Sequence, residues 1–178
     1  MSIISKIDVI LVDKNDNQIG TEEKLSAHKA GKLHRAFSIF VFNKKKELLI
    51  HKRASEKYHS GGLWTNTCCS HPRVGEQLEV AVHRRLEEEL GFDTELEKKF
   101  HFIYKAQVGD LTEHEFDHVF FGQFDGKFTP NPEEVEEVEW VSYENLVYDM
   151  DEHPEIYTEW FKIIMEDHGD KIKDLWPK

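Results

Sequence analysis

Short stretches of the chain alternate between apolar and polar residues, which is the pattern of half-buried β-strands. These stretches are 7–12, 18–25, 36–42, 47–51, 96–107, 116–124 and 133–141. Asn, Asp and Lys cluster at 13–17 and 43–46, which favours tight turns and predicts two hairpins in the first half of the chain. The segment 28–34 is short and interrupted by a glycine, so it is predicted to be a loop.

The pattern becomes helical at 76–90. Apolar residues recur there at intervals of four and form one stripe: Leu78, Val82, Leu86 and Leu90. Gly91 is suited to end this helix. Ser142 is predicted to cap a short helix, and 154–167 is predicted to form an amphipathic helix that carries Trp160. Strands around a central helix, with a helical tail, indicate a mixed α/β class.

Length and charge narrow the classes of protein. A chain of 178 residues fits a single domain, 1–178, since domains run roughly 100–200 residues. The net charge of -12 disfavours a nucleic-acid partner, so an anionic substrate would need a local basic pocket. The longest apolar run, 37–42, is too short to span a membrane, and the N-terminus has no evident signal peptide. Cys68 and Cys69 are adjacent and are expected to be free thiols, as in a reducing cytoplasm.

A thiol beside a metal-binding imidazole is the main chemical signal. Residues 65–72 read Thr-Asn-Thr-Cys-Cys-Ser-His-Pro, and further along the chain come Glu113 and Glu115. Side chains at i and i+2 of a strand point to the same face, so both carboxylates are expected together. A thiol and a carboxylate gathered around a metal form an acid–base arrangement, and the chain is therefore predicted to be an enzyme.

The helical segment resembles the signature motif of the Nudix superfamily, a loop–helix–loop that ends in Arg-Glu-hydrophobic-x-Glu-Glu-x-Gly. Aligned on Arg84, the carboxylate at the helix start is Glu76 and the carboxylate pair is Glu88 and Glu89. Arg85 stands where the motif has its first helical Glu, and a guanidinium there favours holding a diphosphate over cleaving it. The resemblance implies an α/β/α sandwich with a mixed sheet, a central loop–helix–loop and a C-terminal helix.

The octapeptide, the altered motif and the Glu113–Glu115 pair together resemble type I isopentenyl-diphosphate isomerase, from Lys24 to Trp160. This resemblance implies that Cys69 and Glu115 carry protons, with Tyr104 as helper. It also implies substrate-binding residues, basic ones for the diphosphate and an indole over the hydrocarbon: Lys24, Arg53, Lys57, Arg85 and Trp160.

The same resemblance implies two metal ions. One would bind a set of imidazoles and carboxylates: His28, His34, His71, Glu113 and Glu115. Such ligands suit Mn²⁺ or Zn²⁺. The other, Mg²⁺, would be bound with the diphosphate by Glu89 and by the backbone carbonyl of Cys69. The remaining histidines, His59 among them, are interpreted as surface residues, and the acidic run 133–137 as an exposed face.

The implied reaction interconverts isopentenyl and dimethylallyl diphosphate in isoprenoid biosynthesis. A proton is added to the terminal alkene carbon and another is removed from the carbon next to the oxygen-bearing one. The intermediate is a tertiary carbocation, which the Trp160 indole could stabilise by roughly 2 kcal/mol. Glu115 with Tyr104 is the expected acid. Cys69 is expected to act as a thiolate, its pKa lowered by cationic neighbours or metal.

Two other functions stay open at this point. A Nudix hydrolase of a nucleoside diphosphate derivative is disfavoured by Arg85 and by a cysteine that such cleavage does not need. A non-catalytic, metal-dependent binding module would tolerate Cys69→Ala. In the favoured interpretation the partner is a small diphosphate substrate, without nucleic acid or membrane, and the chain is a cytoplasmic monomer or weak dimer.

Overall fold

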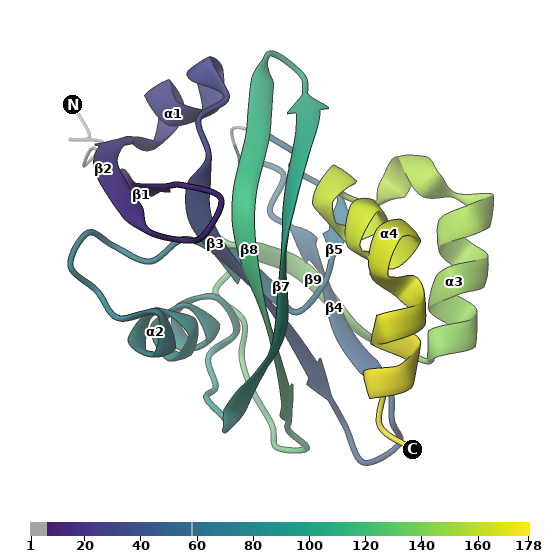
Figure 1. Cartoon of the computed structure of the whole chain (residues 1–178). Coiled ribbons are helices and arrows are strands. Elements are labelled where there is room, and N and C mark those ends of the chain that lie inside the picture. The colour runs from purple at the N-terminus through teal and green to yellow at the C-terminus, as the bar shows by residue number, and fades with distance from the viewer. Residues whose placement is uncertain (1–6, 58) are drawn as a thin grey trace.

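A mixed β-sheet runs through the middle of the molecule, with helices on both of its faces (Figure 1). The computed structural model describes residues 7–57 and 59–178. Most of the N-terminal stretch on which the signal-peptide prediction rests, 1–6, lies outside these residues. The strands are β1 (Asp8–Val12), β2 (Gln18–Glu23), β3 (His34–Phe42), β4 (Leu48–Arg53), β5 (Trp64–Thr65), β6 (Cys68–Ser70), β7 (Leu96–Val108), β8 (Leu111–Gln123) and β9 (Val135–Val141). The helices are α1 (Lys24–Ala30), α2 (Leu78–Leu90), α3 (Tyr143–Glu152) and α4 (Glu159–Leu175), with a 3₁₀ turn at Pro154–Ile156.

Strand β3 organises the sheet. Along one edge it pairs in parallel with β8, from His34 opposite Glu115 to Phe42 opposite Gln123. Along its other edge it meets β1, β6 and β4 in succession. The long β7–β8 hairpin extends the sheet beyond β8, and β9 extends it beyond β4. The short β6 therefore lies directly beside β3, which places the cysteine segment at the centre of the sheet.

The two faces of the sheet bury separate apolar clusters. Helices α3 and α4 cover one face, and α2 covers the other (Figure 1). Neighbouring residues of a strand point to opposite faces, so Cys69 packs beside the α4 cluster while Cys68 is fully buried in the α2 cluster. Both cysteines are free thiols, as predicted. None of the helices in the described residues combines the length and apolar character that crossing a bilayer requires.

The predicted loop at 28–34 is wrong, because α1 occupies Lys24–Ala30. The carboxylate of Glu23 accepts hydrogen bonds from the backbone N–H groups of Leu25 (3.0 Å) and Ser26 (2.9 Å), so it caps donors that the first helical turn leaves unpaired. Gly31 ends the helix with a φ of 63°. A seven-residue helix that is capped at both ends can therefore form without a long apolar stripe. Its residue His28 is buried.

The C-terminal helix begins later and runs further than the predicted 154–167. After the 3₁₀ turn the chain is extended at Tyr157, which forms a parallel bridge with Trp64. The backbone N–H of Thr158 donates to the Trp64 carbonyl at 2.9 Å, and α4 then continues to Leu175. This bridge ties the start of α4 to β5. It therefore fixes where Trp160 lies.

Candidate active site

A pocket is lined by residues of α1, α2, α4 and of strands β4, β6, β7 and β8. Its wall is made of basic, acidic, thiol and aromatic side chains: Lys24, Arg53, Lys57, His59, Cys69, Ser70, His71, Arg85, Glu89, Tyr104, Glu113, Glu115 and Trp160. The structure thus brings together the predicted catalytic and substrate-binding residues. The predicted ligands His28 and His34 are fully buried and lie against Glu113 and Glu115 rather than in the wall.

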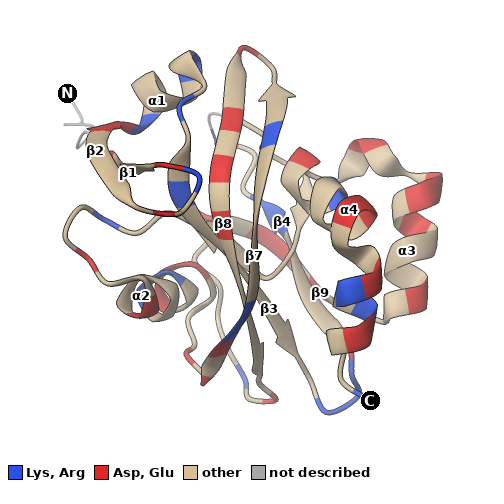
Figure 2. Ribbon diagram, viewed as in Figure 1, with Lys and Arg blue, Asp and Glu red and all other residues tan. Residues whose placement is uncertain are grey.

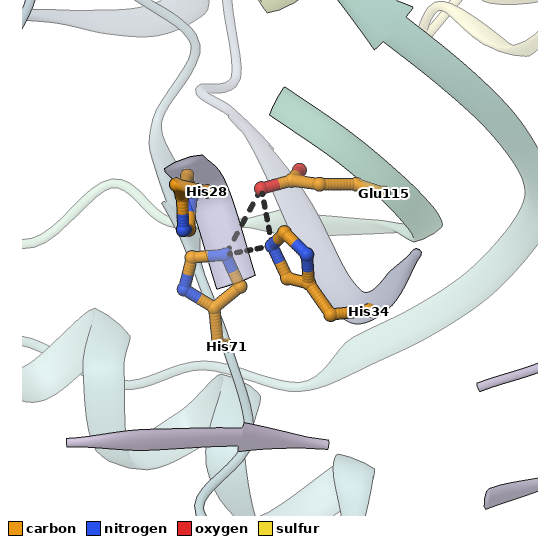
Figure 3. A group of neighbouring side chains, drawn as sticks. All are labelled: His28, His34, His71 and Glu115. Atoms are coloured by element: carbon orange, nitrogen blue, oxygen red, sulfur yellow. Dashed lines mark hydrogen bonds and ion pairs between the residues drawn. The ribbon is translucent and has the colours of Figure 1, made fainter. Parts of the chain in front are cut away.

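A compact group of metal-binding side chains lies beside this pocket (Figure 3). His28, His34, His71 and Glu115 each offer one ligand atom, and these atoms all lie within 4.8 Å of one another. His71 Nε2 is 2.9 Å from a Glu115 oxygen and 3.2 Å from His34 Nε2. Glu113 lies just outside the group, with one carboxylate oxygen 3.1 Å from His28 Nε2.

The orientation of the rings suits a cation. His28 Nδ1 is 2.6 Å from the Lys24 carbonyl, and His34 Nδ1 is 2.9 Å from the Lys32 carbonyl. A carbonyl only accepts, so each Nδ1 donates to its carbonyl and each Nε2 faces the other ligand atoms of the group. Imidazole nitrogens and carboxylate oxygens this close together form a donor set that a divalent metal fits.

The pKa values of this group follow from burial and from the carboxylates. Burial lowers the pKa of His71 to about 3, so its ring is neutral. Burial alone would raise the pKa of Glu115, but hydrogen bonds with His34 and His71 outweigh it and hold that pKa well below the usual range. For Glu113, burial and the nearby charge of Glu115 raise the pKa. Glu115 therefore loses its proton more readily than Glu113.

Two acid–base groups face the pocket from different strands. The Tyr104 hydroxyl donates to Glu115 at 2.8 Å, across the directly opposed pair of β7 and β8. The Cys69 thiol donates to the Asn66 amide oxygen at 2.9 Å. Burial, and after it the negative charge of Asp117, raise the pKa of Cys69 well above its ordinary value. The predicted lowering of that pKa by cationic side chains is therefore wrong, and its lowering by a metal ion stays a prediction.

The basic groups of the pocket are partly engaged by carboxylates. Arg85 forms ion pairs with Glu88 (2.8 Å) and with Glu89, so it lies among the acidic residues of its own helix. Lys57 pairs with Glu134, which is half-buried, so the interpretation of the acidic run as exposed is wrong for Glu134 and confirmed for Glu133, Glu136 and Glu137. The Nε atoms of Arg53 and Arg85 are buried without a hydrogen-bond partner among the described residues. Unpaired buried N–H groups at a pocket leave capacity for an anion.

Some residues of the site were not predicted from the sequence. His59 Nε2 is 3.5 Å from a Glu113 oxygen, and its ring meets Trp160 edge-on with centroids 5.9 Å apart. Burial, helped by the charge of Arg53, lowers the pKa of His59 to about 3, so the ring is neutral. Ser38 and Asp117 lie behind Cys69. Strand alternation from His34 and Glu115 could have placed them there, whereas no spacing signals His59.

Comparison with known proteins agrees with this geometry. Residues 32–161 match the model of the NUDIX domain. A protein of Deinococcus radiodurans, DR0079, shares the fold with a TM-score of 0.69 and 21% identity, over 81% of this chain and 88% of that one. The MutT protein from Methanosarcina mazei has a TM-score of 0.64 at 19% identity, covering 79% of this chain and 96% of that one. The fold and the altered helix motif therefore define a protein of the NUDIX domain family.

Two curated relatives narrow this class. Isopentenyl-diphosphate Delta-isomerase 2 of Photorhabdus laumondii is 54% identical over 158 residues, which is 88% of this chain and 89% of the relative. The isopentenyl-diphosphate Delta-isomerase of Serratia proteamaculans is 48% identical over 171 residues, 96% of each chain. Within the NUDIX fold, this chain belongs to the isopentenyl-diphosphate Delta-isomerases.

Proposed function

We propose that this chain interconverts isopentenyl diphosphate and dimethylallyl diphosphate by adding one proton and removing another. The observation that carries the proposal is one pocket that brings a thiol, Cys69, and a carboxylate, Glu115, together in its wall. An allylic shift of a double bond needs one proton donor and one proton acceptor, and these two groups supply them. A set of basic side chains in the same wall suits the diphosphate.

The raised pKa of Cys69 and the lowered pKa of Glu115 favour, in this proposal, Cys69 as the acid and Glu115 as the base. From isopentenyl diphosphate, the Cys69 thiol gives its proton to the terminal alkene carbon, and the positive charge develops on the tertiary carbon. The Glu115 carboxylate then takes a proton from the carbon next to the oxygen-bearing one, while the Tyr104 hydroxyl holds that carboxylate in place at 2.8 Å. The return reaction exchanges the two roles. This order differs from the predicted one, in which Glu115 was the acid.

The aromatic side chain of the pocket fits the charge that forms. The Trp160 ring lies in the wall with its Nε1 bonded to Thr65 at 2.9 Å, which fixes the plane of the indole. An indole face attracts a cation by about 2 kcal/mol when water is excluded. The Arg53 guanidinium carbon lies 5.2 Å from the ring centroid, so this face already accepts a positive group.

Two metal sites support the reaction in this proposal. His28, His34, His71 and Glu115, with Glu113 beside them, would hold Mn²⁺ or Zn²⁺. Glu89 and the backbone carbonyl of Cys69 would hold Mg²⁺ together with the diphosphate. When bound, these ions neutralise negative charge on the carboxylates and the diphosphate and strengthen the acidity of nearby groups.

The alternative of a diphosphate hydrolase finds less support. Such an enzyme holds its metal ions with carboxylates on one face of the motif helix. Here Arg85 replaces one of these carboxylates and forms ion pairs with Glu88 and Glu89. The remaining carboxylates are thus engaged by a fixed positive charge rather than left free for several cations.

The test is incubation of the protein with isopentenyl diphosphate, Mg²⁺ and Mn²⁺ in deuterated water, followed by NMR. We expect dimethylallyl diphosphate carrying deuterium. Cys69→Ala should lower turnover about 10²–10⁴-fold, because it removes one acid–base group. Cys68→Ala is the matched control, since its thiol lies on the opposite face and outside the pocket wall, and it should retain turnover. Release of phosphate without alkene movement, or full turnover by Cys69→Ala, would contradict the proposal.

A further inference from the structure

A continuous path of buried hydrogen bonds connects the indole of the pocket with its thiol. The Trp160 Nε1–H donates to the Thr65 hydroxyl at 2.9 Å, and that hydroxyl donates to the Asn66 amide oxygen at 3.0 Å. The Cys69 thiol donates to the same amide oxygen at 2.9 Å. Thr65 and Asn66 are 1% exposed. The middle of the path is therefore shielded from solvent.

The orientation of the Asn66 amide is fixed by its other contacts. Its nitrogen donates to two backbone carbonyls, those of Ile39 (3.1 Å) and Cys68 (3.2 Å). If the amide were flipped, its oxygen would face two acceptors and both of these bonds would be lost. The amide oxygen must therefore face the Thr65 hydroxyl and the Cys69 thiol, which makes it a pure acceptor for both.

The Cys69 thiol has a second contact, with Ser38 of β3. The Ser38 oxygen lies 3.4 Å from Cys69 Sγ, and its hydroxyl donates to Asp117 at 2.7 Å. Since that hydroxyl proton points to Asp117, Ser38 also turns a lone pair to the sulfur. Ser38 of β3 lies directly opposite Cys69 of β6, and Asp117 of β8 lies opposite Ala36, two residues before Ser38. The S–H bond thus has acceptors on both sides and a restricted set of directions.

We propose that Thr65 and Asn66 are positioning residues that hold the Cys69 S–H and the Trp160 indole in one fixed relative geometry. This inference rests on the proposed function and deepens it. One group delivers the proton, and the other faces the carbon that becomes positive, so their mutual placement determines the barrier of the protonation step. Neither Thr65 nor Asn66 lines the pocket, and both act through the residues that do.

A threonine series tests this role in turnover. Thr65→Val keeps the shape of the side chain and removes the hydroxyl that joins Trp160 to Asn66. We expect kcat to fall about 10–100-fold with KM within about twofold, because misplacement affects the transition state and not substrate binding. Thr65→Ser, which restores the hydroxyl, should recover most of kcat.

Thr67→Val is the matched control for the loss of a buried hydroxyl. Thr67 belongs to the same segment and is fully buried, and its hydroxyl bonds to the backbone N–H of Val41 and the carbonyl of Leu49, off the path. It should keep kcat within about threefold when all variants are assayed below their unfolding transitions. A KM increase without loss of kcat in Thr65→Val, or equal losses of kcat in both valine variants, would overturn the proposal.

A measurement without substrate separates this proposal from the proposed function. In metal-loaded protein labelled with ¹⁵N-tryptophan, the Trp160 indole N–H, assigned with Trp160→Phe, should move upfield and exchange faster in Thr65→Val. It should be unchanged in Thr67→Val. An unchanged indole N–H in Thr65→Val would show that the path does not hold Trp160. Failure of the wild-type protein to isomerise would instead count against the proposed function alone.

Discussion

At the scale of single residues, the site contains two acid–base groups with different affinities for a proton, the Cys69 thiol and the Glu115 carboxylate. Burial of Cys69, and after it the charge of Asp117, raise its pKa and outweigh the hydrogen bonds with Ser38 and Asn66, which lower it. Glu115 accepts hydrogen bonds from His34 and His71, which lower its pKa. Two titratable groups whose environments push their pKa values apart are suited to serve as acid and base in one reaction.

The prediction at this scale concerns His59, which separates Glu113 from the Trp160 ring. His59→Ala should lower kcat/KM about tenfold, because the carboxylate loses a polar neighbour and the indole loses an edge contact. Steady-state kinetics measures this loss. His153→Ala, at a half-exposed histidine outside the pocket, should leave kcat/KM unchanged. Equal values for His59→Ala and wild type would show that His59 has no part in the site.

The candidate site was largely predictable because its residues lie in motifs with fixed spacing, and its omissions have different causes. Ser38 and Asp117 follow from strand alternation once His34 and Glu115 are assigned to the site. His59 lies in a turn before Gly61 and Gly62, where the direction of a side chain depends on tertiary contacts. The protonation of Cys69 depends on burial, which no local pattern reveals.

At the scale of elements, the helix that carries the family motif depends on how it ends. Gly91 closes α2 with a φ of 75°, and a Cβ added there would lie 2.3 Å from the Thr129 carbonyl oxygen. This segment leads into β7 and packs closely on the loop before β9. The prediction of the helix end at Gly91 is confirmed, and the reason includes a close approach of two backbones that the sequence did not show.

Two glycines of similar conformation allow that close approach to be measured. Gly75 has a φ of 78° and nothing within 4 Å of an added Cβ. Gly75→Ala should therefore cost only the left-handed conformation, about 1 kcal/mol. Gly91→Ala should lower the free energy of unfolding by roughly 2–4 kcal/mol, because the clash adds to that cost. Urea denaturation distinguishes them, and equal losses would show that the loop at Thr129 yields freely.

The missed helix α1 illustrates what patterns of apolar residues do not report. Its predicted absence rested on its length and its glycine. The structure shows that Glu23 and Gly31 cap it at its two ends. Short helices of this kind are stabilised by caps and tertiary packing more than by periodicity. The error matters for function, since α1 carries His28.

At the scale of the whole molecule, the metal ligands come from distant parts of the fold. His28 lies on α1, His34 on β3, His71 after β6 and Glu115 on β8. We propose that the chain forms one domain, 1–178, because these elements share one sheet and one site. Figure 2 shows acidic residues along β8 and basic residues on β4, so side chains of both charges lie near the pocket.

Removal of metal should therefore destabilise the fold. A chelator is expected to lower the melting temperature by roughly 5–10 °C. This corresponds to a loss of about 3 kcal/mol in the free energy of unfolding when the free metal concentration is about one hundred times the Kd. Differential scanning calorimetry with and without chelator measures this shift. His34→Asn should abolish the difference.

His114→Asn is the matched control for the chelator experiment. His114 lies between Glu113 and Glu115 but bonds to the Gly31 carbonyl at 2.9 Å and is not part of the ligand group. This variant should retain the full chelator-dependent shift. A melting temperature that does not respond to chelator in the wild-type protein would mean that the ligand group does not couple metal binding to folding.

The register of the β7–β8 hairpin has a further consequence. Tyr104 lies directly opposite Glu115, and Ala106 opposite Glu113. If β8 were offset by one residue, its side chains would exchange faces, and His114 would turn toward the ligand group while both carboxylates turned away. The slipped pairing would thus lose both carboxylates from the ligand group. We therefore expect metal binding to favour the native pairing over a slipped one.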